Sequence, residues 1–215
     1  MDLKKDLRKR IINERTLLSG YELQSENEAI IGNVLLVLNS LNKELRKNSD
    51  SFIKLINFQD SDYDSDIQFI NSSRAIGLYL PFKGEPDLTK LMLLSKGWSF
   101  ALPKLGSNNI RFVNYQIGAC LEKISFKSKT LSQPVSDLEV VPYVIIAPGL
   151  AYSIDGYRLG YGAGCYDKYL SCKKETGLIV KIGVCFDEYL LESLPYQDHD
   201  IKFDYIITDR TILKL

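Results

Sequence analysis

The sequence predicts an α/β protein: a single-domain, three-layer sandwich with a Rossmann-like, mostly parallel sheet and helices on both faces. Short apolar runs alternate with helical segments over residues 75–208, which is typical of βα repeats. Val140–Ala147 is an almost unbroken apolar run, as expected of a strand buried on both faces. The chain of 215 residues is closer to one domain than to two, so one domain spanning 1–215 is expected.

Two helices are expected at the N-terminus, within residues 1–48. The first carries one apolar stripe, formed by Leu3, Leu7, Ile11 and Leu18, and ends at Ser19-Gly20. The second is expected to begin near Ser25, because Glu28 three residues later completes a capping box. The polar stretch Asp60–Asp66 predicts a loop.

The remaining elements follow from short apolar runs and their Gly and Pro boundaries. Strands are expected at 75–80, 98–102, 110–115, 140–147, 178–186 and 205–208. Helices are expected over Pro86–Leu94, over about ten residues before Gly177, and over Glu188–Leu194.

Composition excludes several classes of protein. The chain has 27 basic and 27 acidic side chains, so it lacks the strongly basic character of a nucleic-acid-binding domain. Four cysteines without a CxxC pair, and a single histidine, exclude a zinc ribbon, a disulfide framework and a His-rich metal site. Reduced thiols, no signal peptide and no membrane segment predict a cytoplasmic protein, and we expect a monomer.

The most informative segment is the glycine-rich loop after the buried run. Gly156, Gly160, Gly162 and Gly164 crowd together beside Arg158 and precede a helix. Backbone N–H groups, a helix N-terminus and an arginine together favour a phosphate or other anion site. The alternative is a tight turn with close helix–strand packing. The pattern is neither a Walker A loop nor the usual dinucleotide fingerprint.

Two carboxylates and one histidine remain ambiguous from the residues alone. Asp167 lies in the first turn of the helix after the loop, where it either stabilises the helix dipole or binds magnesium beside phosphates. His199 and Asp200 lie just ahead of the last predicted strand. His199 is either a general base or simply solvated.

Seven segments, in order along nearly the whole chain, resemble the 5-formyltetrahydrofolate cyclo-ligase family, also called 5,10-methenyltetrahydrofolate synthetases. They are Lys4-Lys-Asp-Leu-Arg8, Gly77–Glu85, Ala101–Lys104, Pro148–Ala151, Arg158–Asp167, His199-Asp200 and Asp204–Thr208. The resemblance implies cyclisation of 5-formyltetrahydrofolate to 5,10-methenyltetrahydrofolate, with ATP as cosubstrate, Mg²⁺ as cofactor, and release of ADP and phosphate.

The resemblance also implies roles for individual residues. ATP would be bound by the N-terminal segment (Lys4, Lys5, Asp6, Leu7 and Arg8) and by the loop (Arg158, Leu159, Gly160, Tyr161, Gly162, Ala163, Gly164, Cys165 and Tyr166). The folate would contact Leu80, Glu85, Tyr161, Gly162, Ala163, Gly164 and Cys165, and Mg²⁺ would be held by Asp167 and Asp200. Arg158 and Lys4 would stabilise charge during phosphoryl transfer.

The chain departs from the family pattern at several positions. Cys165-Tyr166 replaces a tyrosine pair, and Ala163 stands where glycine or lysine is common. Gln133 and Tyr189 replace a frequent glutamate and glutamine. Three other functions remain open: a sugar-phosphate isomerase or acyl-CoA transferase on a similar scaffold, a non-catalytic binding protein, and an RNA-binding relative.

Overall fold

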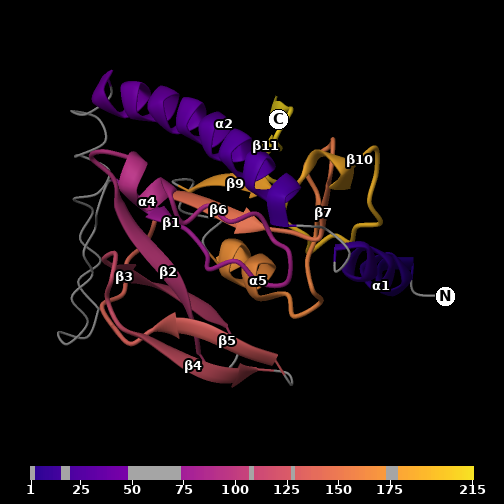
Figure 1. Ribbon diagram of the computed structural model, residues 1–215, viewed down its shortest axis with the longest axis horizontal. Coiled ribbons are helices and arrows are strands. Elements are labelled where there is room, and N and C mark those ends of the chain that lie inside the picture. The colour runs from indigo at the N-terminus through magenta and orange to yellow at the C-terminus, as the bar shows by residue number, and fades with distance from the viewer. Residues whose placement is uncertain (1–2, 16–19, 48–73, 107–108, 127–128, 173–178) are drawn as a thin grey trace.

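The computed structural model describes residues 3–15, 20–47, 74–106, 109–126, 129–172 and 179–215 (Figure 1). The helices are α1 (Leu3–Arg15), α2 (Gly20–Lys47), α4 (Leu91–Leu94) and α5 (Cys165–Cys172), with a 3₁₀ turn over Asp187–Tyr189. The strands are β1 (Ala75–Gly77), β2 (Ser99–Leu105), β3 (Ile110–Tyr115), β4 (Leu121–Phe126), β5 (Lys129–Pro134), β6 (Val144–Pro148), β7 (Ala151–Ser153), β8 (Arg158–Leu159), β9 (Val180–Val184), β10 (Leu190–Leu191), β11 (Tyr205–Ile207) and β12 (Ile212–Lys214).

A seven-stranded sheet forms the centre of the fold, in the order β12-β11-β9-β6-β1-β2-β3. The five inner strands are mutually parallel, and the edge strands β3 and β12 pair antiparallel to their neighbours. Every residue of β6 is buried, as its apolar sequence predicts. The mostly parallel α/β sheet expected from the sequence is therefore confirmed.

Strands β1 and β6 are parallel neighbours, but the strand of this sheet that follows each of them in sequence lies on opposite sides of the pair. It passes from β1 through α4 to β2, and from β6 through α5 to β9. Since such crossovers are right-handed, α4 and α5 cover opposite faces of the sheet. Figure 1 shows α2 and α5 on either side of the sheet. A topological switch point thus lies between the carboxyl ends of β1 and β6, where open α/β sheets bind ligands.

The structure corrects three predicted helices. The second helix begins at Gly20 rather than near Ser25, and Leu23, ahead of the predicted cap, packs partly buried against the core. The helix predicted from Pro86 is limited to α4. Tyr79 Oη donates to the Pro86 carbonyl, and the Asp87 side chain accepts from Thr89 N–H. The Pro86 carbonyl and the Thr89 N–H therefore bond to side chains rather than within a helix. None of the described helices has the length and apolar character needed to cross a bilayer.

The third correction concerns Glu188–Leu194, where the 3₁₀ turn leads directly into β10, which pairs with β7. Tertiary pairing therefore overrides the short helical pattern. The predicted loop at Asp60–Asp66 lies outside the described residues.

Two small sheets were not predicted. One is β10-β7-β8, and the other is the hairpin of β4 and β5. Strand β4 is mostly exposed and lacks the apolar alternation by which strands are found in a sequence. Its register joins Leu121 to Pro134 and Phe126 to Lys129, so both strands stay paired along their length.

Candidate functional site

A cavity of about 980 Å³ opens at the switch point of the sheet. Its walls are formed by α1, the segment 79–85 after β1, the ends of β2 and β3, the β4–β5 hairpin, the glycine-rich loop leading into α5, and the segment 197–200. The cavity is large enough for a drug-sized ligand. Its walls come from regions far apart in the sequence, so the site exists only in the folded chain.

Glycines in the loop are required by geometry. Gly162 and Gly164 have φ of +90° and +65°, in the left-handed region that side chains disfavour. A Cβ on Gly160 would lie 2.8 Å from Arg158 Nη1, so this glycine makes room for the guanidinium. The loop therefore combines a tight turn with a close approach to a buried cation.

Arg158 is the buried cation of the cavity wall. Its side chain is 7% exposed, and Nη2 lies 2.9 Å from Asp167 Oδ2. Nη1 donates to the Pro148 carbonyl at 3.2 Å, while Nε has no hydrogen-bond partner in the described part of the chain. Burial alone would lower the pKa of Arg158, but the Asp167 carboxylate outweighs it and the net shift is upward.

Helix α1 faces the cavity with charged residues rather than with the predicted leucine stripe. Leu3 is 66% exposed, and Leu18 lies outside the described residues. Lys4, Arg8 and Arg15 share one helix face with Ile11, since positions 4, 8, 11 and 15 fall at helical spacing. Of the expected stripe, Ile11 is buried and Leu7 packs partly buried against the core, whereas Leu3 is exposed.

Each cation on this face of α1 binds a distant part of the chain. Lys4 Nζ donates to Asp200 Oδ2 at 2.5 Å, and Arg8 Nε donates to the Gly160 carbonyl at 2.8 Å. Burial would raise the pKa of Asp200, but Lys4 and the Gln197 N–H more than offset it, so the pKa is lowered. Lys4 and Arg8 are thereby fixed at the cavity wall beside the glycine loop.

Glu85 is held in the segment after β1, where Phe82 N–H donates to its Oε2 at 3.0 Å. Burial raises its pKa to about 7, against lowering by Phe82, Arg15, Arg158 and Lys129. Glu85 does not lie at a helix entry, because no helix begins at Pro86 and the next helix is α4. Glu85 and Leu80 both line the cavity.

Most of the predicted site residues meet in this one cavity. Its walls include Lys4, Arg8, Leu80, Glu85, Arg158, Gly160, Tyr161, Gly162, Ala163, Gly164, Cys165, Tyr166, Asp167 and Asp200. Four predicted ATP-binding residues do not line it. Lys5 and Asp6 are exposed, Leu7 is half-buried and Leu159 is buried behind the loop. His199 lines the cavity beside Asp200.

The two predicted magnesium ligands fit that ion by type and number. Mg²⁺ prefers one or two carboxylates together with water and phosphate oxygens. Asp167 and Asp200 line the same cavity, and the described residues hold no cluster of three or more metal-ligating groups that would favour another ion. Each carboxylate is paired with a cation, Asp167 with Arg158 and Asp200 with Lys4.

The sequence did not reveal the hairpin wall of the cavity. Lys129 from β5 lies 4.4 Å from the centre of the Tyr161 ring. Lys104 holds the far end of the hairpin, donating to the carbonyls of Val135 and Ser136 at 3.0 and 3.2 Å. Gln133 also joins it to β2, since its Oε1 accepts from Leu105 N–H. No apolar pattern marks the hairpin, so only the folded structure identifies these residues.

Comparison with known proteins bears on this arrangement. A model of the 5-formyltetrahydrofolate cyclo-ligase family matches residues 64–209, which is more than half of the chain. The chain belongs to the 5-formyltetrahydrofolate cyclo-ligase family. The matched range contains Glu85, Arg158, Asp167 and Asp200, whereas α1 lies outside it.

Curated cyclo-ligases align with much of the chain. The Escherichia coli K12 enzyme is 30% identical over 146 residues, covering 63% of this chain and 78% of the relative. The Mycolicibacterium smegmatis enzyme is 29% identical over 149 residues, covering 65% and 75%. The probable cyclo-ligase of Schizosaccharomyces pombe is 27% identical, over 55% of this chain and 65% of its own length.

Solved structures of the family share the fold. The NMR structure of Aquifex aeolicus 5,10-methenyltetrahydrofolate synthetase superposes with a TM-score of 0.69 and 29% identity, over 99% of this chain and 92% of the other. A 5,10-methenyltetrahydrofolate synthetase from Mycoplasma pneumoniae gives a TM-score of 0.63 over 98% and 100%, at 23% identity. The likeness extends over α1 as well as the matched range.

Proposed function

We propose that this protein catalyses the ATP- and Mg²⁺-dependent cyclisation of 5-formyltetrahydrofolate to 5,10-methenyltetrahydrofolate. One observation carries the proposal: two cation–carboxylate pairs, Lys4–Asp200 and Arg158–Asp167, line one cavity together with a glycine-rich loop. Phosphoryl transfer needs cations around the phosphates, carboxylates for a metal, and backbone N–H groups held in place. Membership of the cyclo-ligase family supplies the substrate class.

The reaction is difficult because a formamide is a weak electrophile and its oxygen is a poor leaving group. Transfer of the γ-phosphoryl group to the formyl oxygen forms an imidate phosphate and releases ADP. The N10 amine then attacks the activated carbon, phosphate leaves, and the five-membered ring closes. The protein has to align the two substrates and stabilise spreading negative charge, so it needs no nucleophile of its own.

Charge stabilisation falls to Lys4, Arg8 and Arg158. The Arg158 side chain is 7% exposed, and a charge removed from water acts more strongly on a neighbouring phosphate than an exposed one. When bound, Mg²⁺ would neutralise charge on the phosphate oxygens. Asp167 and Asp200 would hold the metal, and Lys4 and Arg158 would then be available to the phosphates.

The folate is assigned to the part of the cavity between the segment 79–85 and the hairpin. Phe82 and Tyr161 pack edge to face there, with ring centroids 5.7 Å apart, and β4 adds Leu121, Ile124 and Phe126 to the apolar lining. Glu85 lines the cavity, and its carboxylate would accept hydrogen bonds from pterin N–H groups. Cys165 lines the cavity where the family pattern has a tyrosine, so the smaller side chain would leave more room on the loop side.

A direct assay tests the proposal. Incubating the protein with 5-formyltetrahydrofolate, ATP and Mg²⁺ should produce the absorbance band of the methenyl product and one ADP per turnover. Omitting ATP, or supplying tetrahydrofolate without a formyl group, should give neither. A folded protein that binds phosphates without producing the band would instead support a phosphate-binding or non-catalytic role.

We further propose that the protein acts as a cytoplasmic monomer. All four cysteines are free, which agrees with a reducing compartment. Sedimentation of the purified protein at assay concentration would test the monomer.

A further inference from the structure

Arg15 is a buried cation that the reaction outlined above does not use. It is 4% exposed at the end of α1, and its Nη2 donates to the carbonyls of Gly149 and Leu150, each at 2.8 Å. Its Nε and Nη1 have no hydrogen-bond partner among the described residues. Burying a guanidinium is costly, so a chain that retains one at this position needs a compensating reason.

The surroundings of Arg15 connect three parts of the site. The carbonyls that it binds follow β6 directly, at the switch point of the sheet. Gly84 lies against its stem, where an added Cβ would be 3.4 Å from Arg15 Cβ, and Gly84 has φ of +71°. Its guanidinium carbon lies 4.7 Å from the centre of the Tyr189 ring.

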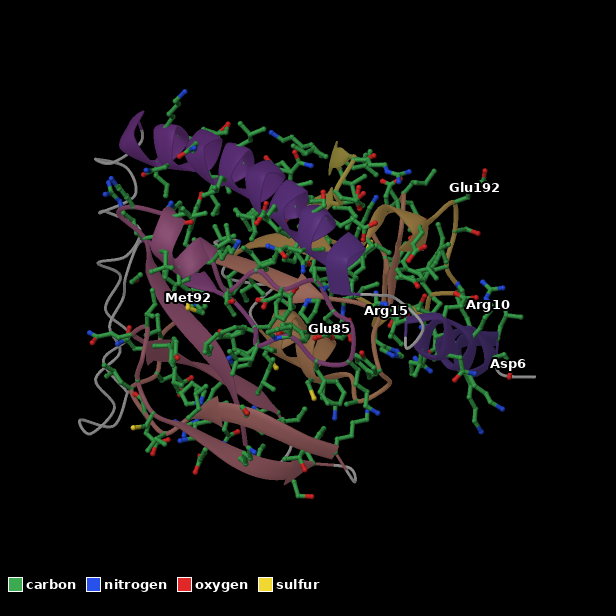
Figure 2. The ribbon with its side chains drawn as sticks, viewed as in Figure 1. Asp6, Arg10, Arg15, Glu85, Met92 and Glu192 are labelled. Carbon is green, nitrogen blue, oxygen red and sulfur yellow. The ribbon has the colours of Figure 1, made fainter. Side chains whose placement is uncertain are left out.

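The sequence places Arg15 on the helix face that serves the nucleotide. Lys4 and Arg8 precede it on that face, and Glu85 follows Gly84 in the segment assigned to the folate. Figure 2 shows Arg15 beside the segment that carries Glu85, whereas Asp6 and Arg10 lie farther toward the N-terminal end of α1. Arg15 therefore links the helix of one subsite to the turn of the other.

We propose that Arg15 is a positioning residue that locks α1 and the turn Phe82–Glu85 onto the end of β6, so that the nucleotide and folate subsites form together. This inference rests on the proposed function for the names of the two substrates. Arg15 does not line the cavity, so it acts through Arg8 and Glu85 rather than by touching a substrate.

The electrostatic consequence falls on Glu85. Three cations face this carboxylate: Arg15 from α1, Arg158 from the glycine loop, and Lys129 from the hairpin. Tyr79, Tyr161 and Tyr166 also interact with it and remain neutral at ordinary pH, because burial raises the pKa of each. Since Arg15 lowers the pKa of Glu85, its removal should move that pKa above about 7.

The test compares three variants with the wild-type protein. R15Q removes the charge but keeps a side chain that can donate hydrogen bonds. R15K keeps the charge but lacks the planar guanidinium with its several N–H donors. R10Q is the matched control, because Arg10 is exposed on the same helix. In R15Q, KM for ATP and KM for 5-formyltetrahydrofolate should rise together, each about tenfold or more, since one helix and one turn lose a shared anchor.

A second readout separates positioning from a general loss of structure. The pH at which folate binding is half-maximal should move upward in R15Q, and R15K should return it toward the wild-type value. R10Q should leave both KM values and the pH profile unchanged. Unchanged KM values and pH profile in folded R15Q would overturn the proposal.

A third readout does not depend on activity. Carbon NMR titration of the Glu85 carboxyl in the ligand-free protein should show a higher pKa in R15Q than in wild type or R10Q. If the Glu85 pKa is higher in R15Q but the wild-type protein makes no methenyl product, the positioning role is supported and the proposed function is refuted. If R15Q does not fold, R15K decides: loss of the guanidinium's paired donors should still raise both KM values together, and a protein with wild-type KM for both substrates would overturn the proposal.

Discussion

Lys4 and Asp200 lie 196 positions apart in the chain, yet Lys4 Nζ is 2.5 Å from Asp200 Oδ2. Their side chains are 16% and 15% exposed, so the pair is largely shielded from water. It closes the candidate site by joining α1 to the loop before β11. The family match begins at residue 64, so this contact, like those of Arg8 and Arg15, links α1 to the matched range.

Lys4→Met should raise KM for ATP by roughly 10- to 100-fold, because a charge-assisted hydrogen bond is worth about 1.5–3 kcal/mol. KM for the folate should change less, since Lys4 lies on the nucleotide side. Steady-state kinetics with each substrate varied in turn would check this. Lys9→Met is the matched control, because Lys9 is exposed on the same helix; an equal effect in both variants would contradict the assignment.

Arg158→Lys should lower kcat by about 10²- to 10³-fold, the usual effect of removing one preorganised donor that stabilises transition-state charge. Lysine keeps the charge but not the fork that binds both Asp167 and Pro148. Arg158→Ala should in addition unfold more easily, since it leaves Asp167 unpaired. Single-turnover kinetics, with circular dichroism as a check on folding, would measure both effects; near-normal turnover in the lysine variant would remove Arg158 from the reaction.

Asp167→Asn should raise the Mg²⁺ concentration needed for half-maximal activity, because an amide is a weaker magnesium ligand than a carboxylate. Asp198→Asn serves as the control, since Asp198 is an exposed carboxylate close to Asp200 in the chain. Titration of activity with Mg²⁺ at saturating ATP is the measurement. If both variants follow the wild-type curve, Asp167 is not a ligand.

Glu85→Gln should change how stability depends on pH. The folded-state pKa of Glu85 is about 7 and the ordinary pKa of a glutamate is 4.5, so between these values the unfolded chain has lost a proton that the folded chain retains. Wild-type stability should therefore fall as pH rises from about 4.5 to about 7, relative to the variant. Urea unfolding of both proteins at pH 5 and pH 8 would show it. The expectation fails if the stability difference is the same at both pH values.

Lys104→Met should loosen the hairpin wall of the cavity. Lys104 is 11% exposed and pairs with Asp137 at 3.0 Å besides binding two carbonyls. Leaving those carbonyls unpaired should lower the free energy of unfolding by ~1–3 kcal/mol and raise KM for the folate more than KM for ATP. Lys123→Met, an exposed position on the same hairpin, provides the comparison. Equal KM effects on the two substrates would argue against a folate-side hairpin.

Much of the sheet could be predicted because burial leaves a pattern in the chain. The apolar runs around β6, β9 and β11 mark strands with both faces covered, and the glycine loop marks the carboxyl end of β6. The hairpin left no such pattern, and the helix predicted over Pro86–Leu94 is longer than the observed α4. Strand β4 of the hairpin is largely exposed, and the helix is cut short because Pro86 O accepts a hydrogen bond from Tyr79 and the Asp87 carboxylate accepts one from Thr89 N–H.

The sequence by itself determined the fold class, the glycine loop and most of the charged residues of the candidate site, because residue type and local spacing carry that information. Only the tertiary structure decided which charges meet. It paired Lys4 with Asp200, turned the charged face of α1 inward in place of Leu3, and buried Arg15 against the end of β6. The physical reason is that hydrogen bonds and ion pairs between distant segments depend on distance in space, which periodicity along the chain does not encode.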